Sequence, residues 1–232
     1  MGSFFERIIV NVGLVGLIFV AILFITNRRF KRRTIKQDKF LEDEMEANTS
    51  RRRDVEEEYF FHPNLAILPV NDKAEGNIAK KQDMVVRLSD KKMVRFPMKL
   101  TNTELKKAYG PSNLEIITGY EENYTRYIGA LADWALALLE TDKTNDKASD
   151  RSEHKTLEVD VEANAEANAI RILEYTVELG SEFRKTYTNL ADYYRKKGNF
   201  DKLDDLMKQV QVSFNDEGIK QSLVKYIMDK KN

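Results

Sequence analysis

The chain has no cysteine and only two histidines among its 232 residues. Without cysteine there is no disulfide framework, no thiolate zinc site, no iron–sulfur cluster and no cysteine nucleophile. Two histidines, His62 and His154, are too few for the common histidine-rich metal sites. Because His62 stands directly before Pro63, we expect it to serve in a turn or in packing and not as a catalytic base. The composition therefore predicts no metal site and no cofactor.

The motifs on which many enzyme sites are built are also missing. There is no Gly-rich phosphate loop, no Gly-x-Ser-x-Gly and no His-Glu-x-x-His. The acids stand in charged runs and not singly among apolar neighbours, the setting that suits acid catalysis. Asp142 and Asp146 suggest a calcium loop, but Lys147 stands where that loop needs glycine. We predict no enzyme activity and no small-molecule substrate.

Neither sign of charge is in excess over the whole chain, because 38 Lys and Arg face 38 Asp and Glu. This balance excludes a polycationic nucleic-acid binder. The distribution is uneven, since residues 1–33 contain six basic residues and a single acid, Glu6. The remainder has 32 basic and 37 acidic residues, so we expect it to bind no nucleic acid.

One long apolar run stands near the start of the chain. Residues 8–26 carry no charge, and fourteen of these nineteen residues are Ile, Leu, Val or Phe. As a helix the run would be about 28 Å long, close to the hydrocarbon thickness of a bilayer. A cleaved signal peptide would carry its basic residues before the run, not after it. The run predicts a single N-terminal transmembrane helix.

A basic cluster follows this run. By the positive-inside rule it places the N-terminus outside and the rest of the chain in the cytoplasm, beside a cell membrane. The cluster needs no further role than this topological one, but it also predicts contact with anionic lipid headgroups. Its members are Arg28, Arg29, Lys31, Arg32 and Arg33.

The next part of the chain changes character twice. Residues 34–58 are nearly all charged and predict an exposed stalk, helical or partly disordered. Residues 59–70 are aromatic and apolar, and Pro63 and Pro69 exclude a helix interior, so we expect an extended segment laid against a core. The apolar stretches 84–88 and 93–96 flank Ser-Asp-Lys-Lys, which predicts a small β-hairpin.

Helix signals begin at residue 101. Thr101 with Glu104, and Ser112 with Glu115, have capping-box spacing. The first helix should be short because Gly110-Pro111 ends it, and the second should cover about 113–140 with an apolar face that includes Trp134. Residues 141–156 are almost free of apolar side chains and predict a flexible insertion, after which a helix resumes.

Residues 184–213 carry the most specific pattern. Tyr187, Leu190, Ala191 and Tyr194 share one helix face, Gly198-Asn199 makes a turn, and a second helix turns Leu203, Leu206, Met207 and Val210 inward. This pattern resembles a tetratricopeptide repeat. It departs from the family at Leu203 and Val210, where alanine is usual, and at Asn215, which replaces the closing proline. A generic antiparallel helical hairpin is the alternative.

The period of 34 residues extends the resemblance in both directions. Forward, Val224 aligns with Leu190 and Met228 with Tyr194, so that 217–229 could form a terminal cap. Backward, the helices around 128–138 and 169–176 would make a degenerate repeat. The predicted fold class is thus mainly α: a transmembrane helix followed by a tetratricopeptide-like cytoplasmic domain with a small β-hairpin. Its expected divisions are 1–33, 34–58, 59–100 and 101–232.

In the family, the first helix of each repeat lines a concave surface that binds extended peptides. The resemblance implies a partner-binding surface at Lys185, Thr188, Asn189, Asp192 and Arg195. Lys185 and Asn189 are one helical turn apart and could hold a carboxylate together, although a plain solvated helix face is the simpler explanation of both. We therefore expect a membrane-anchored adaptor or scaffold that binds a protein partner. The alternative is a structural or assembly subunit of a membrane complex, with 59–70 as its permanent interface.

Overall fold

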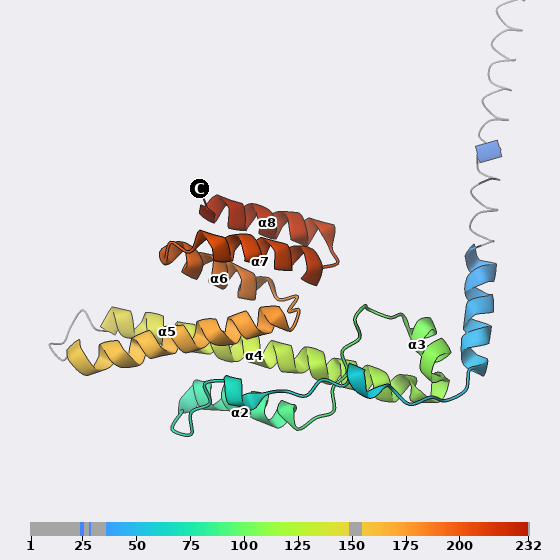
Figure 1. Ribbon diagram of the computed structural model, residues 1–232, viewed down its shortest axis with the longest axis horizontal. Helices are drawn as coiled ribbons and strands as arrows, with labels where there is room; N and C mark the ends of the chain where they lie inside the picture. Colours follow the sequence, from blue (N-terminus) through green and yellow to red (C-terminus); the bar gives the residue numbers. More distant parts are fainter. Residues whose placement is uncertain (1–23, 26–27, 29–35, 149–154, 232) are drawn as a thin grey trace, which may run out of the picture. The chain divides into compact units, whose positions relative to one another are not determined.

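The computed structural model describes residues 24–25, 28, 36–148 and 155–231, and it describes side chains outside 141–164. Within these residues the chain forms two compact units. One consists of Met1–Val55 with Met98–Glu115, and the other of Glu56–Pro97 with Ile116–Asn232. Every regular element among the described residues is a helix (Figure 1).

The first unit contains a helix over residues 36–49, α3 (Asn102–Tyr109) and the short η3 (Pro111–Asn113). The predicted capping box at the start of α3 is confirmed: the Glu104 N–H donates to Thr101 Oγ1, and the Thr101 N–H donates to Glu104 Oε2 at 2.7 Å. As expected, α3 ends at Gly110, whose φ of +84° only glycine adopts readily. The stretch 34–58, predicted as a stalk, thus includes a regular helix of fourteen residues from 36 to 49.

The second unit is built on two long helices, α4 (Leu114–Ala148) and α5 (Lys155–Glu178). Both contribute to one apolar core, and the Tyr124 hydroxyl on α4 donates to the Leu179 carbonyl just after α5, at 2.6 Å. Figure 1 shows α2 (Gly76–Ser89) on one side of this pair and α6–α8 on the other. Trp134 is 1% exposed within the core, the position predicted for it.

The predicted β-hairpin is wrong. Residues 84–88 lie in α2, where Ile78, Gln82, Val85 and Leu88 recur at spacings of four, three and three on the less exposed face. Tertiary packing of this stripe outweighs the strand preference of the adjacent valines. Residues 93–95 pair instead with 59–61, through an isolated antiparallel bridge between Phe60 and Val94. In the described residues, no strand accompanies this bridge.

The membrane part of the predicted fold class is also not supported by the described helices. The predicted span 8–26 lies outside the described residues except for Phe24 and Ile25. Among the residues that are described, no helix combines the length and the apolar character needed to cross a bilayer. The corrected fold class is therefore a helical architecture without a hairpin and without a described membrane-spanning helix.

The aromatic segment 59–61 lies against α4, as expected for an extended segment on a core. The Phe61 ring meets Tyr124 edge-on with centroids 5.1 Å apart and Tyr127 at 6.0 Å, while Phe60 lies 6.1 Å from Tyr120. The three tyrosines are four and three residues apart, so they share one face of α4. Two backbone hydrogen bonds hold the segment beside 93–95, from the Phe61 N–H to the Met93 carbonyl and from the Arg95 N–H to the Tyr59 carbonyl. Two short turns, η1 (Glu57–Tyr59) and η2 (Leu65–Ile67), flank its ends.

Candidate partner-binding surface

The last three helices form the region in which the sequence predicts a partner-binding surface. They are α6 (Arg184–Lys196), α7 (Phe200–Ser213) and α8 (Glu217–Lys231), and each of them contacts the other two. The predicted inward face of α6 is confirmed as buried. On α7 the same holds for Leu203, Leu206 and Val210, while Met207 packs partly buried against the core.

The turn between α6 and α7 follows directly from its sequence. Gly198 has a φ of +68°, and the Asn199 N–H donates to the Tyr194 carbonyl five residues earlier, which closes α6. The Asn199 side chain then accepts from the Lys202 N–H at 3.3 Å and caps α7. Gly198 and Asn199 therefore end one helix and begin the next within two residues.

A polar contact connects α5, α6 and α7. The Tyr194 hydroxyl donates to Glu174 Oε1 at 2.6 Å, and Lys202 Nζ lies 3.3 Å from the same oxygen. Burial of the phenol, followed by its bond to the Glu174 carboxylate, raises the pKa of Tyr194 well above its usual range. The phenol therefore stays neutral and keeps its donor, so this contact fixes α6 against its neighbours.

Two polar contacts show that α6 and α8 run parallel. Arg184, the first residue of α6, donates to Ser222 Oγ in the second turn of α8 at 3.0 Å. Further along both helices, Asp192 accepts from the Tyr226 hydroxyl at 2.9 and 3.0 Å. Asp192 and Tyr226 are 34 residues apart, which is one period of the repeat that the sequence resembles.

The face that α8 buries differs from the predicted one by a single residue. The alignment with α6 points to Val224 and Met228, but Leu223 and Ile227 are the fully buried residues, while Val224 is half-buried and Met228 is 51% exposed. One residue corresponds to about 100° of helix rotation. The terminal helix is thus turned about its axis relative to the repeat register.

Of the five predicted binding residues, Asp192 is already engaged. Lys230 Nζ lies 2.6 Å from Asp192 Oδ1, in addition to the Tyr226 contact. Hydrogen bonding to Asp192, and to a smaller extent to Tyr226, raises the pKa of Lys230. Asp192 therefore holds α8 against α6 and does not present a free carboxylate. Sequence reasoning missed this role because the partner lies a full period away.

Thr188 and Asn189 are half-buried and turn their donors toward their own helix. The Asn189 amide donates to the Lys185 carbonyl at 2.7 Å, and the Thr188 hydroxyl donates to the same carbonyl at 3.2 Å. These bonds occupy groups that the predicted carboxylate cradle would need. Lys185 is exposed beside them.

The cations of α6 remain open to solvent. Arg184, Lys185 and Arg195 are exposed, and within the described part of the chain no acid lies at ion-pair distance from any of them. They point away from the buried side of α6, which Tyr187, Leu190 and Tyr194 occupy. We call these three residues the α6 cationic face. The predicted surface thus reduces to cations at both ends of α6, with Asp192 removed from it by α8.

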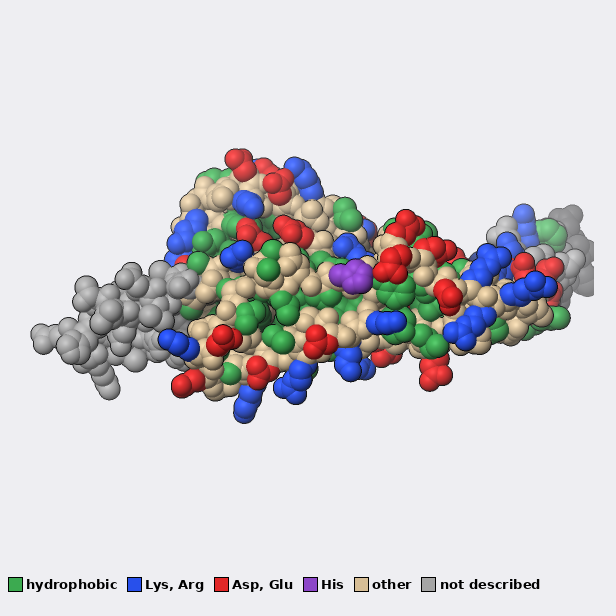
Figure 2. All heavy atoms as spheres, turned by 60° about the horizontal axis from the view of Figure 1, so that its bottom comes forward, with side chains coloured by type: hydrophobic (Ala, Val, Ile, Leu, Met, Phe, Trp, Pro, Cys, Tyr) green, Lys and Arg blue, Asp and Glu red, His purple; other side chains and the backbone are tan. Residues whose placement is uncertain are grey.

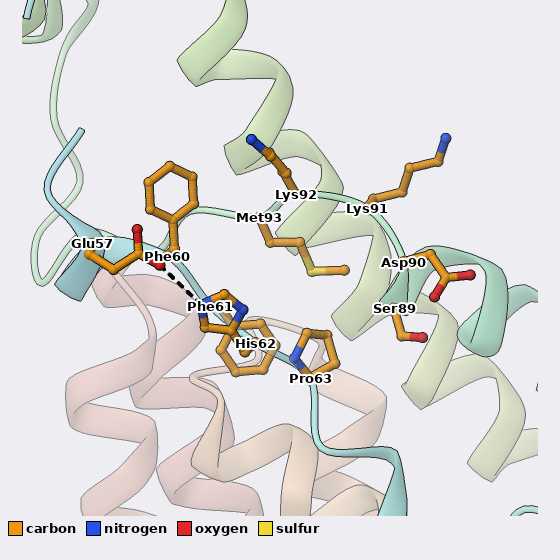
Figure 3. Close-up of a pocket in the computed structure, with 10 residues that line it drawn as sticks. All are labelled: Glu57, Phe60, Phe61, His62, Pro63, Ser89, Asp90, Lys91, Lys92 and Met93. Carbon is orange, nitrogen blue, oxygen red and sulfur yellow. Dashed lines mark ion pairs between the residues drawn. The ribbon is translucent and has the colours of Figure 1, made fainter. Parts of the chain in front are cut away.

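A second candidate site is a half-open groove of about 260 Å³ between residues 57–63 and 89–93 (Figure 3). Phe60, Phe61 and Met93 form its apolar part, and His62 stands on its rim. His62 Nε2 lies 3.6 Å from Glu57 Oε1, and the two side chains are 79% and 86% exposed. The imidazole is open to solvent on the molecular surface (Figure 2, purple).

This groove contains the residue types of a serine–histidine–acid triad, namely Ser89, His62 and Glu57. Their geometry does not suit nucleophilic chemistry. The Ser89 hydroxyl donates to the Val86 carbonyl at 2.7 Å, and Figure 3 shows Ser89 across the groove from His62. A contact of 3.6 Å between two solvated side chains is too long for an orienting hydrogen bond. The groove therefore contributes no argument for catalysis.

The remaining predicted site residues are the basic cluster after the apolar run. Arg28 is exposed, and the other four, Arg29, Lys31, Arg32 and Arg33, lie outside the described residues. Across 36–140 and 165–231, no group of three or more acids and histidines is arranged to hold a metal ion.

Comparisons with protein-family models, with curated proteins and with solved structures found no match to this chain. The functional argument consequently rests on the residues and contacts described above.

Proposed function

We propose that the chain is a non-enzymatic adaptor or scaffold that binds a protein partner through the α6 cationic face. The observation that carries this proposal is the parallel pairing of α6 and α8 by Asp192, Tyr226 and Lys230. This contact builds a continuous two-helix surface and leaves Arg184, Lys185 and Arg195 exposed beside it. Cations on rigid helices suit an acidic segment of a partner, because the helix backbone is already ordered and binding has to order only the side chains.

The tetratricopeptide resemblance supports the same proposal. The Gly198 turn and the small Ala191 at the helix contact are features that the family uses to stack helical hairpins. In such arrays the first helices of successive hairpins line the binding surface, and α6 and α8 would have that role here.

The alternative of a permanent subunit that uses 59–70 as its interface is less favoured. Phe60 and Phe61 direct their rings onto Tyr120, Tyr124 and Tyr127 of α4. This apolar surface is thereby used inside the second unit. A permanent interface at this segment would have to rely on its few exposed side chains, such as Val70.

For its location we propose the cytoplasmic side of a cell membrane. The support comes from the sequence alone, through the uncharged run 8–26 and the basic cluster that follows it. Protease added to right-side-out vesicles should leave residues 36–232 intact. Digestion of those residues would contradict the proposed location and leave the binding proposal standing.

Partner capture tests the binding proposal. The full chain in a mild nonionic detergent, with Lys185→Ala and Arg195→Ala combined, should lose most of the protein that the unchanged chain captures from a detergent extract. The matched control combines Lys91→Ala and Lys92→Ala, which removes two exposed cations elsewhere in the second unit. Equal capture by the two variants would show that the α6 cationic face is not the binding surface.

A further inference from the structure

The three consecutive arginines of the first unit, Arg51, Arg52 and Arg53, stand on a backbone that is held from both sides. The Arg53 N–H donates to the Tyr109 carbonyl at 3.1 Å, and the Asn113 side-chain amide donates to the Arg53 carbonyl at 2.6 Å. Asn113 is 5% exposed, so this bond lies away from solvent. Both backbone polar groups of Arg53 are therefore satisfied by the corner that follows α3.

Gly110 makes this close contact possible. A Cβ atom at residue 110 would lie 2.9 Å from the Arg51 carbonyl carbon and oxygen and 2.9 Å from the Arg52 Cα. All three of these atoms belong to backbone, which cannot move aside as a flexible side chain can. The backbone of the arginine segment is thus seated directly on Gly110.

The three guanidinium groups, in contrast, are free. Arg51, Arg52 and Arg53 are exposed, and among the described residues no carboxylate lies within 4 Å of any of them. Two lysines of this unit, in contrast, are paired with acids: Lys106 binds Glu44, and Lys107 binds Asp43 and Glu46. Among the described residues of this unit, the three arginines are therefore a run of adjacent cations without an acidic partner at ion-pair distance.

We propose that Arg51, Arg52 and Arg53 form a docking site for an acidic peptide segment of a partner protein. A guanidinium group binds a carboxylate through two parallel hydrogen bonds, which gives direction as well as attraction. Because the backbone is already fixed by Tyr109, Gly110 and Asn113, binding orders only the side chains. The site lies in the first unit and does not depend on the α6 cationic face.

The charge of the surrounding unit favours a short peptide over nucleic acid or a lipid surface. The described residues of this unit hold nine basic and eight acidic side chains, and five of the acids lie on the 36–49 helix. A long phosphate backbone or a bilayer needs an extended positive surface, and here it would meet these acids. A segment with a few adjacent carboxylates needs only the three arginines.

Fluorescence anisotropy with a labelled octaglutamate peptide tests this proposal on the full chain in nonionic detergent, at low and at physiological salt. Combined Arg51→Ala, Arg52→Ala and Arg53→Ala should weaken binding about tenfold or more. Combined Lys91→Ala, Lys92→Ala and Lys225→Ala removes the same charge from exposed positions elsewhere and should change affinity less than about twofold. Equal weakening by the two triples would overturn the site.

Two further variants keep the charge and test the geometry. Combined Arg51→Lys, Arg52→Lys and Arg53→Lys retains three cations without the planar fork, and Gly110→Ala retains the arginines but displaces their backbone. Each should weaken octaglutamate binding severalfold, and amide exchange of 36–49 in the lysine variant should match that of the unchanged chain, as a check on the fold of the first unit. Binding equal to that of the unchanged chain in both would overturn the proposal. So would a larger loss of single-stranded DNA or anionic-vesicle binding than of peptide binding when Arg51, Arg52 and Arg53 are replaced by alanine.

Discussion

Different interactions stabilise the inside of each of the two units of this chain. The continuous apolar core, which includes Trp134, Leu173 and Tyr187, is made only of residues of the second unit. In the first unit the fully buried apolar side chains among the described residues are Ala47, Leu105 and Tyr109. Contacts between the 36–49 helix and α3 are largely ionic, from Lys106 and Lys107 to three acids.

This difference predicts different responses to mutation and to solvent. Apolar burial is insensitive to salt and pH, and its loss scales with the area and the cavity created. Ion pairs near the surface contribute little each and weaken as salt rises. The single tryptophan, Trp134, reports on the second unit alone, so the two units can be followed separately: Trp134 fluorescence for one and amide exchange of 36–49 for the other.

The largest effect is expected from Leu173→Ala. Leu173 is 0% exposed at the centre of the second unit's core, so its truncation should lower the free energy of unfolding by about 2–5 kcal/mol. Chemical denaturation followed by Trp134 fluorescence measures this loss. Val212→Ala, at an 82% exposed position of α7, should change it by less than about 0.5 kcal/mol. Similar midpoints for both variants would contradict the assignment of the core.

Ala191→Leu should have the next largest effect. Ala191 is 0% exposed where α6 meets its neighbours, and added methylenes in a packed contact typically cost about 1–3 kcal/mol. The matched control is Ala167→Leu at an exposed position of α5, which should be nearly neutral. A neutral Ala191→Leu in the Trp134 unfolding curve would show that the helices do not approach closely at this position, and the tetratricopeptide register would lose its support.

Sequence patterns predicted α6, α7 and the start of α3 well, because their signals are local. The Gly198-Asn199 turn, the inward residues of α6 and α7 and the capping box of α3 each depend on residues within one or two helical turns. Local sequence therefore contains most of the information that forms them.

Features that depend on distant partners could not be predicted. The apolar pattern of residues 84–88 is too short to distinguish a strand from a helix. Only the packing of these residues in α2 determines that they are helical. The sequence predicted Asp192 as a free surface residue, because its partners Tyr226 and Lys230 belong to another helix. The sequence predicted Arg51–Arg53 as part of a charged stalk. The residues that fix their backbone, Tyr109, Gly110 and Asn113, lie about sixty residues away along the chain.

Gly110→Ala should affect the first unit and spare the second. Gly110 combines a φ of +84° with a ψ of 150°, a region that is nearly restricted to glycine and costs other residues about 1–3 kcal/mol. A methyl group there would also meet the backbone of Arg51 and Arg52. Amide exchange in 36–49 and in α3 should become faster, while the Trp134 unfolding midpoint stays unchanged.

The control for Gly110→Ala is Gly119→Ala on α4. No atom lies within 4 Å of a Cβ built at Gly119, and its φ is in the usual range, so alanine should stabilise the helix by up to about 1 kcal/mol. If both glycine variants left amide exchange in 36–49 unchanged, the arginine segment would not depend on its seat at Gly110.

The smallest effect is expected from salt and pH on the 36–49 helix. Raising NaCl from about 0.1 to about 1 M shortens the screening length from about 10 Å to about 3 Å, which weakens the pairs of Lys106 and Lys107. Amide exchange of 36–49, corrected for intrinsic rates, should rise severalfold. The exchange of α6 should not change, because its fixed position depends on buried Tyr187, Leu190 and Tyr194.

The pH dependence of the same contact has a defined sign at each end. Hydrogen bonding to Lys107 lowers the pKa of Asp43, and bonds from Lys106 and Thr103 lower the pKa of Glu44. Carboxylates with lowered pKa values stabilise the folded form above their ordinary values of 3.8 and 4.5, and this stabilisation is lost as the pH falls through the lowered values. Bonding to Asp43 and Glu46 raises the pKa of Lys107, so its contribution is complete below its ordinary 10.5 and is lost as the pH rises above it. Protection of 36–49 should therefore be constant between about pH 5 and pH 10 and should fall on both sides, and a change at neutral pH would mean that groups other than these hold the helix to α3.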